Sequence, residues 1–321
     1  MNTQFELILI LIAGLTLILL GANYLTDGSA AIARRFNVSG FVVGLTIVAI
    51  GTSMPEMVVS VISALKGSTD IAIGNVVGSN SFNTLIILGM CAVVKPLILT
   101  QSNVHRDIPM GIIASVILLI FTLSGAISRI EGMIMFILYI SMMIYAIRNG
   151  RPSKEEQELD KELESAPQMA VWLAIVMVVG GLVGLIYGGS LFIDSAVGIA
   201  EFYNIPANII AVTLVAGGTS LPEFAASLVS LIKGKSDIAL GNVIGSNIAN
   251  ILLVLGASSV FTPLTLGSIT MIDISVVLLS SILLFVSAFT LGKKVLDRAE
   301  GAILILLYIV YIYYIVSRAV I

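Results

Sequence analysis

Two glutamates stand inside otherwise apolar stretches of this 321-residue chain, Glu56 and Glu223. A charged side chain at the centre of a membrane helix costs about 2.5–3.5 kcal/mol on insertion scales, and such residues are usually functional. Thr52 and Thr219 each precede a glutamate by four residues, so hydroxyl and carboxylate would share one face of a continuous helix. We therefore expect each glutamate to belong to a polar site; a protonated glutamate that only bridges two helices is the alternative.

A stripe of amides and hydroxyls follows each glutamate. Its members recur every four residues: Asn75, Ser79 and Asn83 after Glu56, and Asn242, Ser246 and Asn250 after Glu223. Carboxylate, hydroxyl and amide oxygens are hard ligands, which suit Ca²⁺ and Na⁺ rather than zinc or copper. The chain has one cysteine and one histidine, so a metal centre built from several of either is excluded.

A proline directly precedes each glutamate, Pro55 and Pro222. Proline has no N–H, so the carbonyl four residues earlier, at Gly51 or Gly218, loses its helical partner. Unpaired carbonyls at membrane depth are tolerated only where they line a cavity, and there they coordinate cations. We expect a broken helix whose free carbonyls add to the site, with a proline kink for packing alone as the alternative.

A duplicated segment carries all of these residues. Residues 51–89 recur at 218–256 with a constant offset of 167, and 22 of the 39 positions are identical. The chain is 58% hydrophobic and 11% charged with a mean hydropathy of +1.10, whereas soluble proteins are about 25% charged. Its apolar runs of about 20 residues suit membrane helices. A polar motif repeated in such a chain indicates a transporter built from two halves.

Five apolar spans precede a polar linker and five follow it, so we predict an all-α membrane protein of ten transmembrane helices. The expected parts are a first five-helix half at 1–148, a cytoplasmic acidic linker at 149–167 and a second half at 168–321, with the repeats at about 40–94 and 206–261. Because five is odd, two homologous halves in series enter the membrane from opposite sides. The two five-helix repeats should therefore be inverted.

Basic residues indicate the orientation. With the N-terminus outside, 13 of the 16 lysines and arginines fall in cytoplasmic loops, and only Lys66, Arg129 and Arg318 lie outside. This bias follows the positive-inside rule. It predicts a multi-pass protein of the plasma membrane with both termini outside and the linker in the cytoplasm. We interpret residues 5–20 as a first span rather than a signal peptide, because no lysine or arginine precedes them.

The motif G-T-S-M/L-P-E, followed by G-N-V-x-G-S-N-x-x-N, occurs twice. In this paired form it closely resembles the α-repeats of the cation/Ca²⁺ antiporter superfamily, specifically the prokaryotic sodium/calcium exchangers, over nearly the whole chain. The resemblance implies alternating access, in which helices two, three, seven and eight hold the ions and the first helix of each half slides past them. The ligands that it implies, position by position, are the carbonyls of Ala49 and Ala216 together with Thr52, Ser53, Glu56, Ser79, Asn83, Thr219, Ser220, Glu223, Ser246 and Asn250.

The same resemblance implies Ca²⁺ and Na⁺ as the transported ions. Both glutamates would bridge a central Ca²⁺, with sodium sites around it. We expect no cofactor and no nucleic-acid partner, and a chain that works as a monomer in the lipid bilayer. Some relatives place an Asp where this chain has Asn250, and potassium-dependent exchangers resemble that acidic pattern. Asn250 therefore argues against K⁺ co-transport.

The main alternative is a Ca²⁺/H⁺ antiporter, because two membrane glutamates could release two protons as Ca²⁺ binds. The many hydroxyl ligands favour Na⁺, since a proton needs only the carboxylate. A cation channel usually has a continuous pore lined by rings of charge from several subunits, whereas one chain here carries both halves of the site. A structural scaffold gives no reason for glutamates at depth, and no nucleophile–base pair indicates an enzyme.

Overall fold

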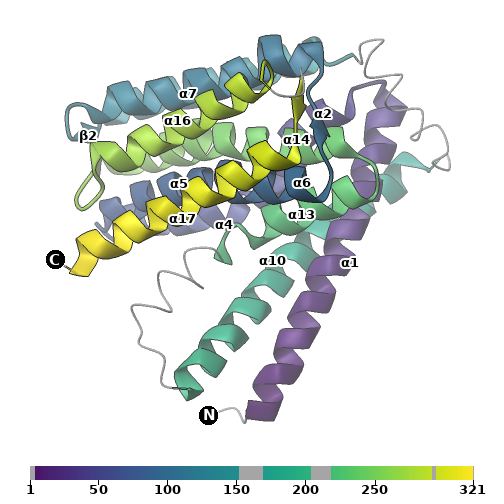
Figure 1. Ribbon diagram of the computed structural model, residues 1–321, viewed down its shortest axis with the longest axis horizontal. Helices are drawn as coiled ribbons and strands as arrows, with labels where there is room; N and C mark the ends of the chain where they lie inside the picture. The colour runs from purple at the N-terminus through teal and green to yellow at the C-terminus, as the bar shows by residue number, and fades with distance from the viewer. Residues whose placement is uncertain (1–3, 152–168, 204–217, 291–293, 321) are drawn as a thin grey trace.

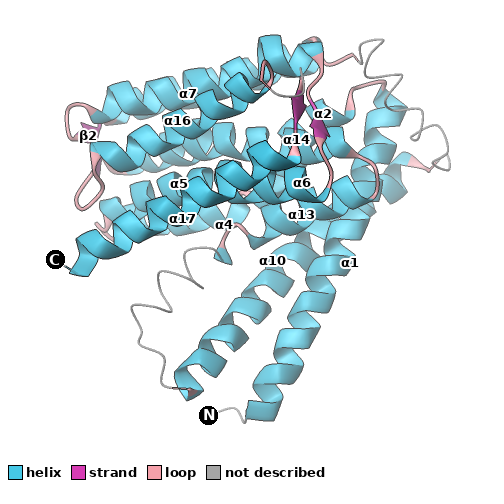
Figure 2. Cartoon of the chain, in the orientation of Figure 1, coloured by secondary structure: helices cyan, strands magenta, loops and turns pink. Residues whose placement is uncertain are grey.

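The computed structural model describes residues 4–151, 169–203, 218–290 and 294–320, and most of these residues lie in helices (Figure 2). Within them, seven helices are long and apolar enough to cross a membrane. A bent pair, Gly40–Thr52 with Met54–Leu65, adds an eighth candidate, and two further apolar helices are shorter, Leu221–Ile232 and Met271–Ser287. The helical class is as predicted, whereas the count of ten spans stays a prediction.

The elements of the first part of the chain, with π-helical segments labelled η, are α1 (Gln4–Phe36), α2 (Gly40–Val43), η1 (Gly44–Val48), α3 (Ala49–Thr52), α4 (Met54–Leu65), α5 (Thr69–Phe82), η2 (Asn83–Ile87), α6 (Leu88–Val94), β1 (Leu97–Ile98), η3 (Asn103–Asp107), α7 (Ile108–Thr122), β2 (Ala126–Ile127) and α8 (Arg129–Arg148). Those of the second part are α10 (Val171–Phe202), α13 (Leu221–Ile232), α14 (Ser236–Ile248), η6 (Ala249–Leu255), α15 (Gly256–Phe261), β3 (Leu264–Thr265), α16 (Met271–Ser287), β4 (Val295–Leu296) and α17 (Arg298–Val320). Most of the linker expected at 149–167 lies outside the described residues.

Four two-residue strands, which the sequence did not predict, lie in the loops at the ends of the bundle (Figure 2). β1 pairs antiparallel with β4, with Leu97 opposite Leu296, and β2 pairs antiparallel with β3, with Ala126 opposite Thr265. Each pair joins a loop of the first part of the chain to a loop of the second. The two parts are therefore connected by backbone hydrogen bonds at their loops as well as by helix packing.

The two longest helices, α1 and α10, run side by side and project from the other helices (Figure 1). Glycines let their backbones touch, as small residues do between membrane helices. A Cβ atom added at Gly21 would lie 2.7 Å from the carbonyl oxygen of Gly181, and one added at Gly181 would lie 2.6 Å from the amide nitrogen of Leu25. Any side chain at these two positions would therefore force the helices apart.

The centre of the molecule is formed by two interrupted helices, α5–η2–α6 and α14–η6–α15. In the most apolar 18-residue stretch of each helix, 72% of the first and 89% of the second is buried, against 22% for α1. The two central helices therefore lie inside the bundle. Their neighbours approach closely: a Cβ atom added at Gly44 of η1 would lie 2.5 Å from the carbonyl oxygen of Ile238 in α14. The polar stripes found in the sequence lie on these two central helices.

Both central helices switch to π-helical hydrogen bonding at corresponding places. η2 begins at Asn83, and η6 begins at Ala249, next to Asn250. π-Helical segments are rare and occur frequently at functional sites, because the extra residue per turn redirects side chains and leaves backbone groups unpaired. η2 and η6 occur where the two polar stripes end, whereas η1 and η3 lie outside the stripes.

Candidate ion-binding site

The helix that carries Glu56 is broken immediately before the glutamate. α3 ends at Thr52, α4 begins at Met54, and the two are bent by 46°. Ser53 at the break has φ −81° and ψ 7°, and Pro55 lies in the first turn of α4, where its missing N–H leaves no helical bond unmade. The second copy is alike: Ser220 has φ −88° and ψ 7° before α13. The sequence prediction of a broken helix is therefore confirmed at Pro55, whereas residues 204–217, which precede the second motif, lie outside the described residues.

The break also places the threonines differently from the sequence prediction. Thr52 does not share a continuous helical face with Glu56, because the helix turns between them. Thr52 instead adjoins Glu223, and Thr219 adjoins Glu56. The hydroxyl of Thr52 also donates to Oδ1 of Asn242 at 3.2 Å. Each threonine thus serves the other copy of the motif, and the expectation of a shared face within one copy is wrong.

The two glutamates are fully buried, and each accepts a hydrogen bond from a serine of the other copy of the motif. Ser53 donates from Oγ to Oε1 of Glu223 at 3.1 Å, and Ser220 donates to Oε1 of Glu56 at 3.3 Å. Ser79 also donates to Oε1 of Glu56, at 3.4 Å. These contacts bring residues about 167 positions apart into one cluster, so the two motifs form a single polar site.

Two asparagines of the stripes hold the glutamate helices in place. Asn75 donates to the backbone carbonyl of Glu56 at 3.2 Å and to Ser60 at 3.0 Å. Asn242 donates to the backbone carbonyl of Glu223 at 3.2 Å and to Ser227 at 2.9 Å. Because the same pair of bonds occurs in both copies, these amides fix the distance between each glutamate helix and the central helix beside it.

Several buried polar atoms here have no hydrogen-bond partner within the described residues. They are Oε2 of Glu56, Oε2 of Glu223, Oγ of Ser246, Oδ1 of Asn250, and both Oδ1 and Nδ2 of Asn83. An unsatisfied buried polar group costs about 1–3 kcal/mol, so such a cluster is stable only if something else completes it. Five of these six atoms are oxygens, which is the ligand chemistry that Ca²⁺ and Na⁺ require.

The charge of the two carboxylates points the same way. The ion pairs within the described part of the chain join Arg106 to Asp107, Lys233 and Lys235 to Asp27, and Arg318 to Asp273, and none includes Glu56 or Glu223. Two buried like charges repel each other strongly at low dielectric. Bound cations or protons would offset them, so the cluster has the electrostatics of a cation site.

The residues expected from the sequence lie as follows. The hydrogen bonds gather Thr52, Ser53, Glu56, Ser79, Ser220 and Glu223, while Asn83, Ser246 and Asn250 are buried on the central helices and Thr219 is half-buried. The buried carbonyl of Ala49 accepts from the amide of Ser53 at 3.0 Å and from the hydroxyl of Thr52 at 3.4 Å. Ala216 lies outside the described residues. Asn80 and Asn247, which are an identical pair in the repeat, were not among the residues predicted for the site.

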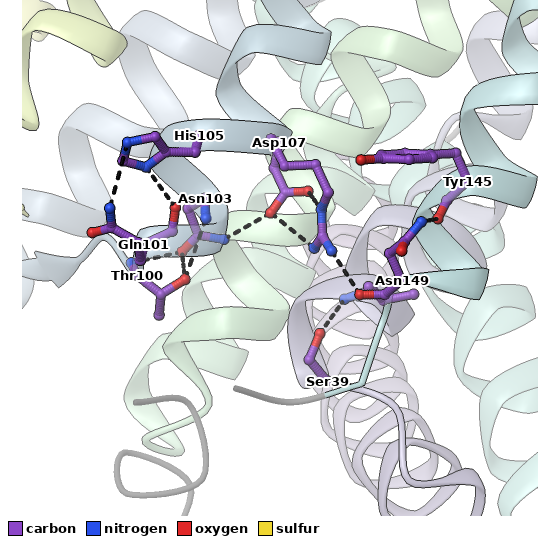
Figure 3. Close-up of polar contacts among 10 residues, drawn as sticks. Ser39, Thr100, Gln101, Asn103, His105, Asp107, Tyr145 and Asn149 are labelled. Atoms are coloured by element: carbon purple, nitrogen blue, oxygen red, sulfur yellow. Dashed lines mark hydrogen bonds and ion pairs between the residues drawn. The ribbon is translucent and has the colours of Figure 1, made fainter. Parts of the chain in front are cut away.

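A second polar cluster, at one end of the bundle, has a different character (Figure 3). Arg106 contacts Asp107 at 2.7 Å and donates to the backbone carbonyl of Asn149 at 2.8 Å, and the amide of Ser39 donates to the carbonyl of Gly150 at 2.8 Å. Its charges are opposite and paired, and its other acceptors are backbone carbonyls and the side-chain oxygens of Asn103 and Thr100. The cluster therefore fastens the end of α8 to the starts of α2 and α7.

A family model described as sodium/calcium exchanger protein matches residues 6–148 and 173–317. The chain belongs to the sodium/calcium exchanger family. Within that family it is 35% identical over 311 residues to a protein of Alkalimonas amylolytica named putative antiporter CaxA, covering 95% of this chain and 97% of that protein. It is 30% identical over 343 residues to the sodium/calcium exchanger MaX1 of Methanosarcina acetivorans, covering 95% and 97%.

A solved structure of the sodium–calcium exchanger NCX_Mj, soaked with 2.5 mM Na⁺ and 0.1 mM Ca²⁺, matches with a TM-score of 0.84 and 33% identity, covering 96% of this chain and 98% of that one. This member of the sodium/calcium exchanger family is thus a multi-pass membrane protein and a cation/Ca²⁺ antiporter. The proteins that it resembles are exchangers and antiporters, which are transporters rather than enzymes.

Proposed function

We propose that this antiporter exchanges Ca²⁺ for Na⁺ at one site shared by its two halves, residues 1–148 and 168–321. The observation that supports this most directly is the pair of crossed bonds, from Ser53 to Glu223 and from Ser220 to Glu56. Each glutamate is held by the other half, so neither half holds a complete site. The ligands would be those that the resemblance implied. They are Thr52, Ser53, Glu56, Ser79, Asn83, Thr219, Ser220, Glu223, Ser246 and Asn250, together with the carbonyls of Ala49 and Ala216.

Exchange follows from charge balance at the two glutamates. Two carboxylates neutralise one Ca²⁺ or two Na⁺, so the two kinds of ion compete for the same oxygens and cannot both be fully bound. A third Na⁺ would leave one net positive charge, and moving that charge across the membrane would make transport electrogenic. The hydroxyl and amide oxygens around the carboxylates favour Na⁺ over H⁺ as the counter-ion, because a proton requires only the carboxylate.

Alternating access would involve the projecting pair α1 and α10, which packs against the helices of the site. Near one end, Asp27 of α1 contacts Lys233 at 2.8 Å and Lys235 at 3.0 Å, where α13 gives way to α14. We propose that the two halves are inverted repeats, that these lysines face the cytoplasm, and that both termini face the outside of the plasma membrane. The excess of lysine and arginine in the loops assigned to the cytoplasm supports this orientation.

Flux through purified protein in liposomes tests the proposal. Vesicles loaded with Na⁺ should take up Ca²⁺ when an outward Na⁺ gradient is present, and vesicles loaded with K⁺ or choline should not. Uptake that ignores the Na⁺ gradient and follows a pH gradient would instead establish the Ca²⁺/H⁺ antiporter. Flux far above carrier rates would indicate a channel. Cross-linking before reconstitution would show whether the monomer, which we propose as the functional unit, is the transporting species.

A further inference from the structure

One buried asparagine outside the ligand set fixes the orientation of a proposed ligand. Asn80 lies on α5 and is fully buried, as is Asn250 on η6. Asn80 donates from Nδ2 to the backbone carbonyl of Asn247 at 3.1 Å, and its Oδ1 accepts from Nδ2 of Asn250 at 3.1 Å. The three residues form a chain of bonds that links the two central helices.

The direction of these hydrogen bonds follows from the first acceptor, the backbone carbonyl of Asn247. A backbone carbonyl can only accept, so the amide of Asn80 must turn its NH₂ group toward Asn247 and its oxygen the other way. Asn250 must then present NH₂ to that oxygen, because two oxygens facing each other would repel. The Oδ1 atom of Asn250 consequently points away from Asn80, and it is buried without a partner in the described part of the molecule.

The arrangement occurs on one side of the site only. Asn247, the repeat mate of Asn80, donates to Oγ1 of Thr84 at 2.7 Å. Thr84 has no counterpart hydroxyl, because the matching position is Ile251. Asn83, the mate of Asn250, has no partner on either amide atom among the described residues. The orientation of the Asn250 amide is therefore fixed by the protein, whereas that of the Asn83 amide is not.

We propose that Asn80 is a positioning residue that commits Asn250 to offering its oxygen, never its NH₂ group, to the transported cation. This rests on the proposed function, in which Asn250 is a ligand. The same bond makes position 250 selective: an ionised Asp there would place a second acceptor against the oxygen of Asn80. Asn80 therefore favours the neutral amide at 250, and with it a site of two carboxylates.

Ca²⁺ dependence of Na⁺-driven uptake tests the role of Asn80. Asn80→Ala should raise the KM for Ca²⁺ about tenfold, the lower end of the 10–100-fold range for residues that orient metal ligands, because the cation can still select the oxygen of a freed amide. The maximal rate per folded protein should stay within about threefold. A purely structural defect would instead lower the amount of active protein and leave KM unchanged.

Three further variants sharpen the result. Asn80→Asp should retain a KM near that of the unaltered protein, because a protonated carboxyl group donates to the carbonyl of Asn247 and accepts from Asn250 as the amide does. Asn247→Ala is the matched control: it removes the mate amide but keeps the carbonyl that orients Asn80. The double variant Asn80→Ala, Asn250→Ala should be no worse than Asn250→Ala alone, since residues acting through one contact are not additive.

The outcomes separate this proposal from the proposed function. Ca²⁺-induced stabilisation against heat, measured in detergent, reports binding without transport. If exchange occurs but Asn80→Ala changes KM less than threefold, or if the double variant shows the sum of both losses, the positioning role is overturned. If no Na⁺-driven uptake occurs yet Ca²⁺ stabilisation weakens in Asn80→Ala and not in Asn80→Asp, the function fails and the positioning role stands. Asn80→Leu, which fills the same space without an acceptor, replaces Asn80→Ala if the latter does not fold.

Discussion

Replacement of Glu56 by glutamine should separate the charge of the site from its shape. The glutamine keeps an oxygen that can accept from Ser79 and Ser220, which now donate to Oε1 of Glu56 at 3.4 and 3.3 Å. It replaces the unpartnered Oε2 with an NH₂ group and removes one of two buried negative charges. Bound Ca²⁺ would then leave one uncompensated positive charge in the membrane interior, whereas one Na⁺ would be balanced by Glu223 alone.

The magnitude follows from the cost of that charge. A charge at membrane depth costs about 2.5–3.5 kcal/mol, and each 1.4 kcal/mol is a factor of ten in affinity. We therefore expect the apparent affinity for Ca²⁺ to fall about 100-fold, while binding of a single Na⁺ falls much less. Heat stabilisation by each ion in detergent, with Ca²⁺ uptake into liposomes alongside, measures both changes.

Glu201→Gln is the matched control, because it removes an exposed carboxylate at the end of α10 without touching the site. Its Ca²⁺ affinity should equal that of the unaltered protein. A Glu56→Gln variant whose Ca²⁺ affinity stays within threefold, or whose Na⁺ and Ca²⁺ affinities fall equally, would refute the charge-balance reasoning.

Three other perturbations have defined outcomes. Gly21→Leu places a side chain where a Cβ atom alone would lie 2.7 Å from the carbonyl oxygen of Gly181; it should separate α1 from α10 and slow uptake while Ca²⁺ still stabilises the protein, and unchanged uptake would contradict this. Asp27→Asn removes partly exposed ion pairs to Lys233 and Lys235, which are worth about 0–1 kcal/mol each; the loss of thermal stability should be small and should vanish at high salt, and a loss that persists in salt would argue against an ion-pair role. Removing both Na⁺ and Ca²⁺ with a chelator and a choline buffer should lower the melting temperature, because the buried oxygens that have no protein partner would lose their bound cations. An unaltered melting temperature would count against a cation site.

Much of the candidate site could be predicted because its sequence motif is duplicated in the chain. Glu56 and Glu223 stood out as charges in apolar sequence, and the constant offset paired each neighbour with a mate. The helix break beside Pro55 was expected because proline has no N–H to donate within a helix. Residue type and spacing are properties of the chain itself, so these features required no knowledge of how the halves meet.

What could not be predicted depends on how the halves meet. The donation from Ser53 to Glu223 joins residues 170 positions apart, and no local spacing reveals it. Helical arithmetic placed Thr52 beside Glu56, because it assumed a straight helix where the backbone bends by 46°. Asn80 was overlooked because its role lies in the direction of a hydrogen bond, and amide orientation leaves no trace in residue type.

The short strands were missed for a related reason. A two-residue strand such as Leu97–Ile98 is too short for an alternating pattern, and it forms only because the loop at Leu296 is brought opposite to it. The helices could be read from apolar runs about 20 residues long, whereas these pairings are consequences of packing. Prediction from the sequence thus succeeded for the helical class and for the long apolar helices, and it failed at contacts between distant segments.

The glycine contact between α1 and α10 has a mechanical consequence. Because the backbones touch at Gly21 and Gly181, there are no long side chains between them to act as a compliant layer. A displacement of one helix must therefore carry the other, so the pair moves as one stiff unit. If the proposed alternating access moves this pair, a shift at one end of the two helices is transmitted to the other end with little loss.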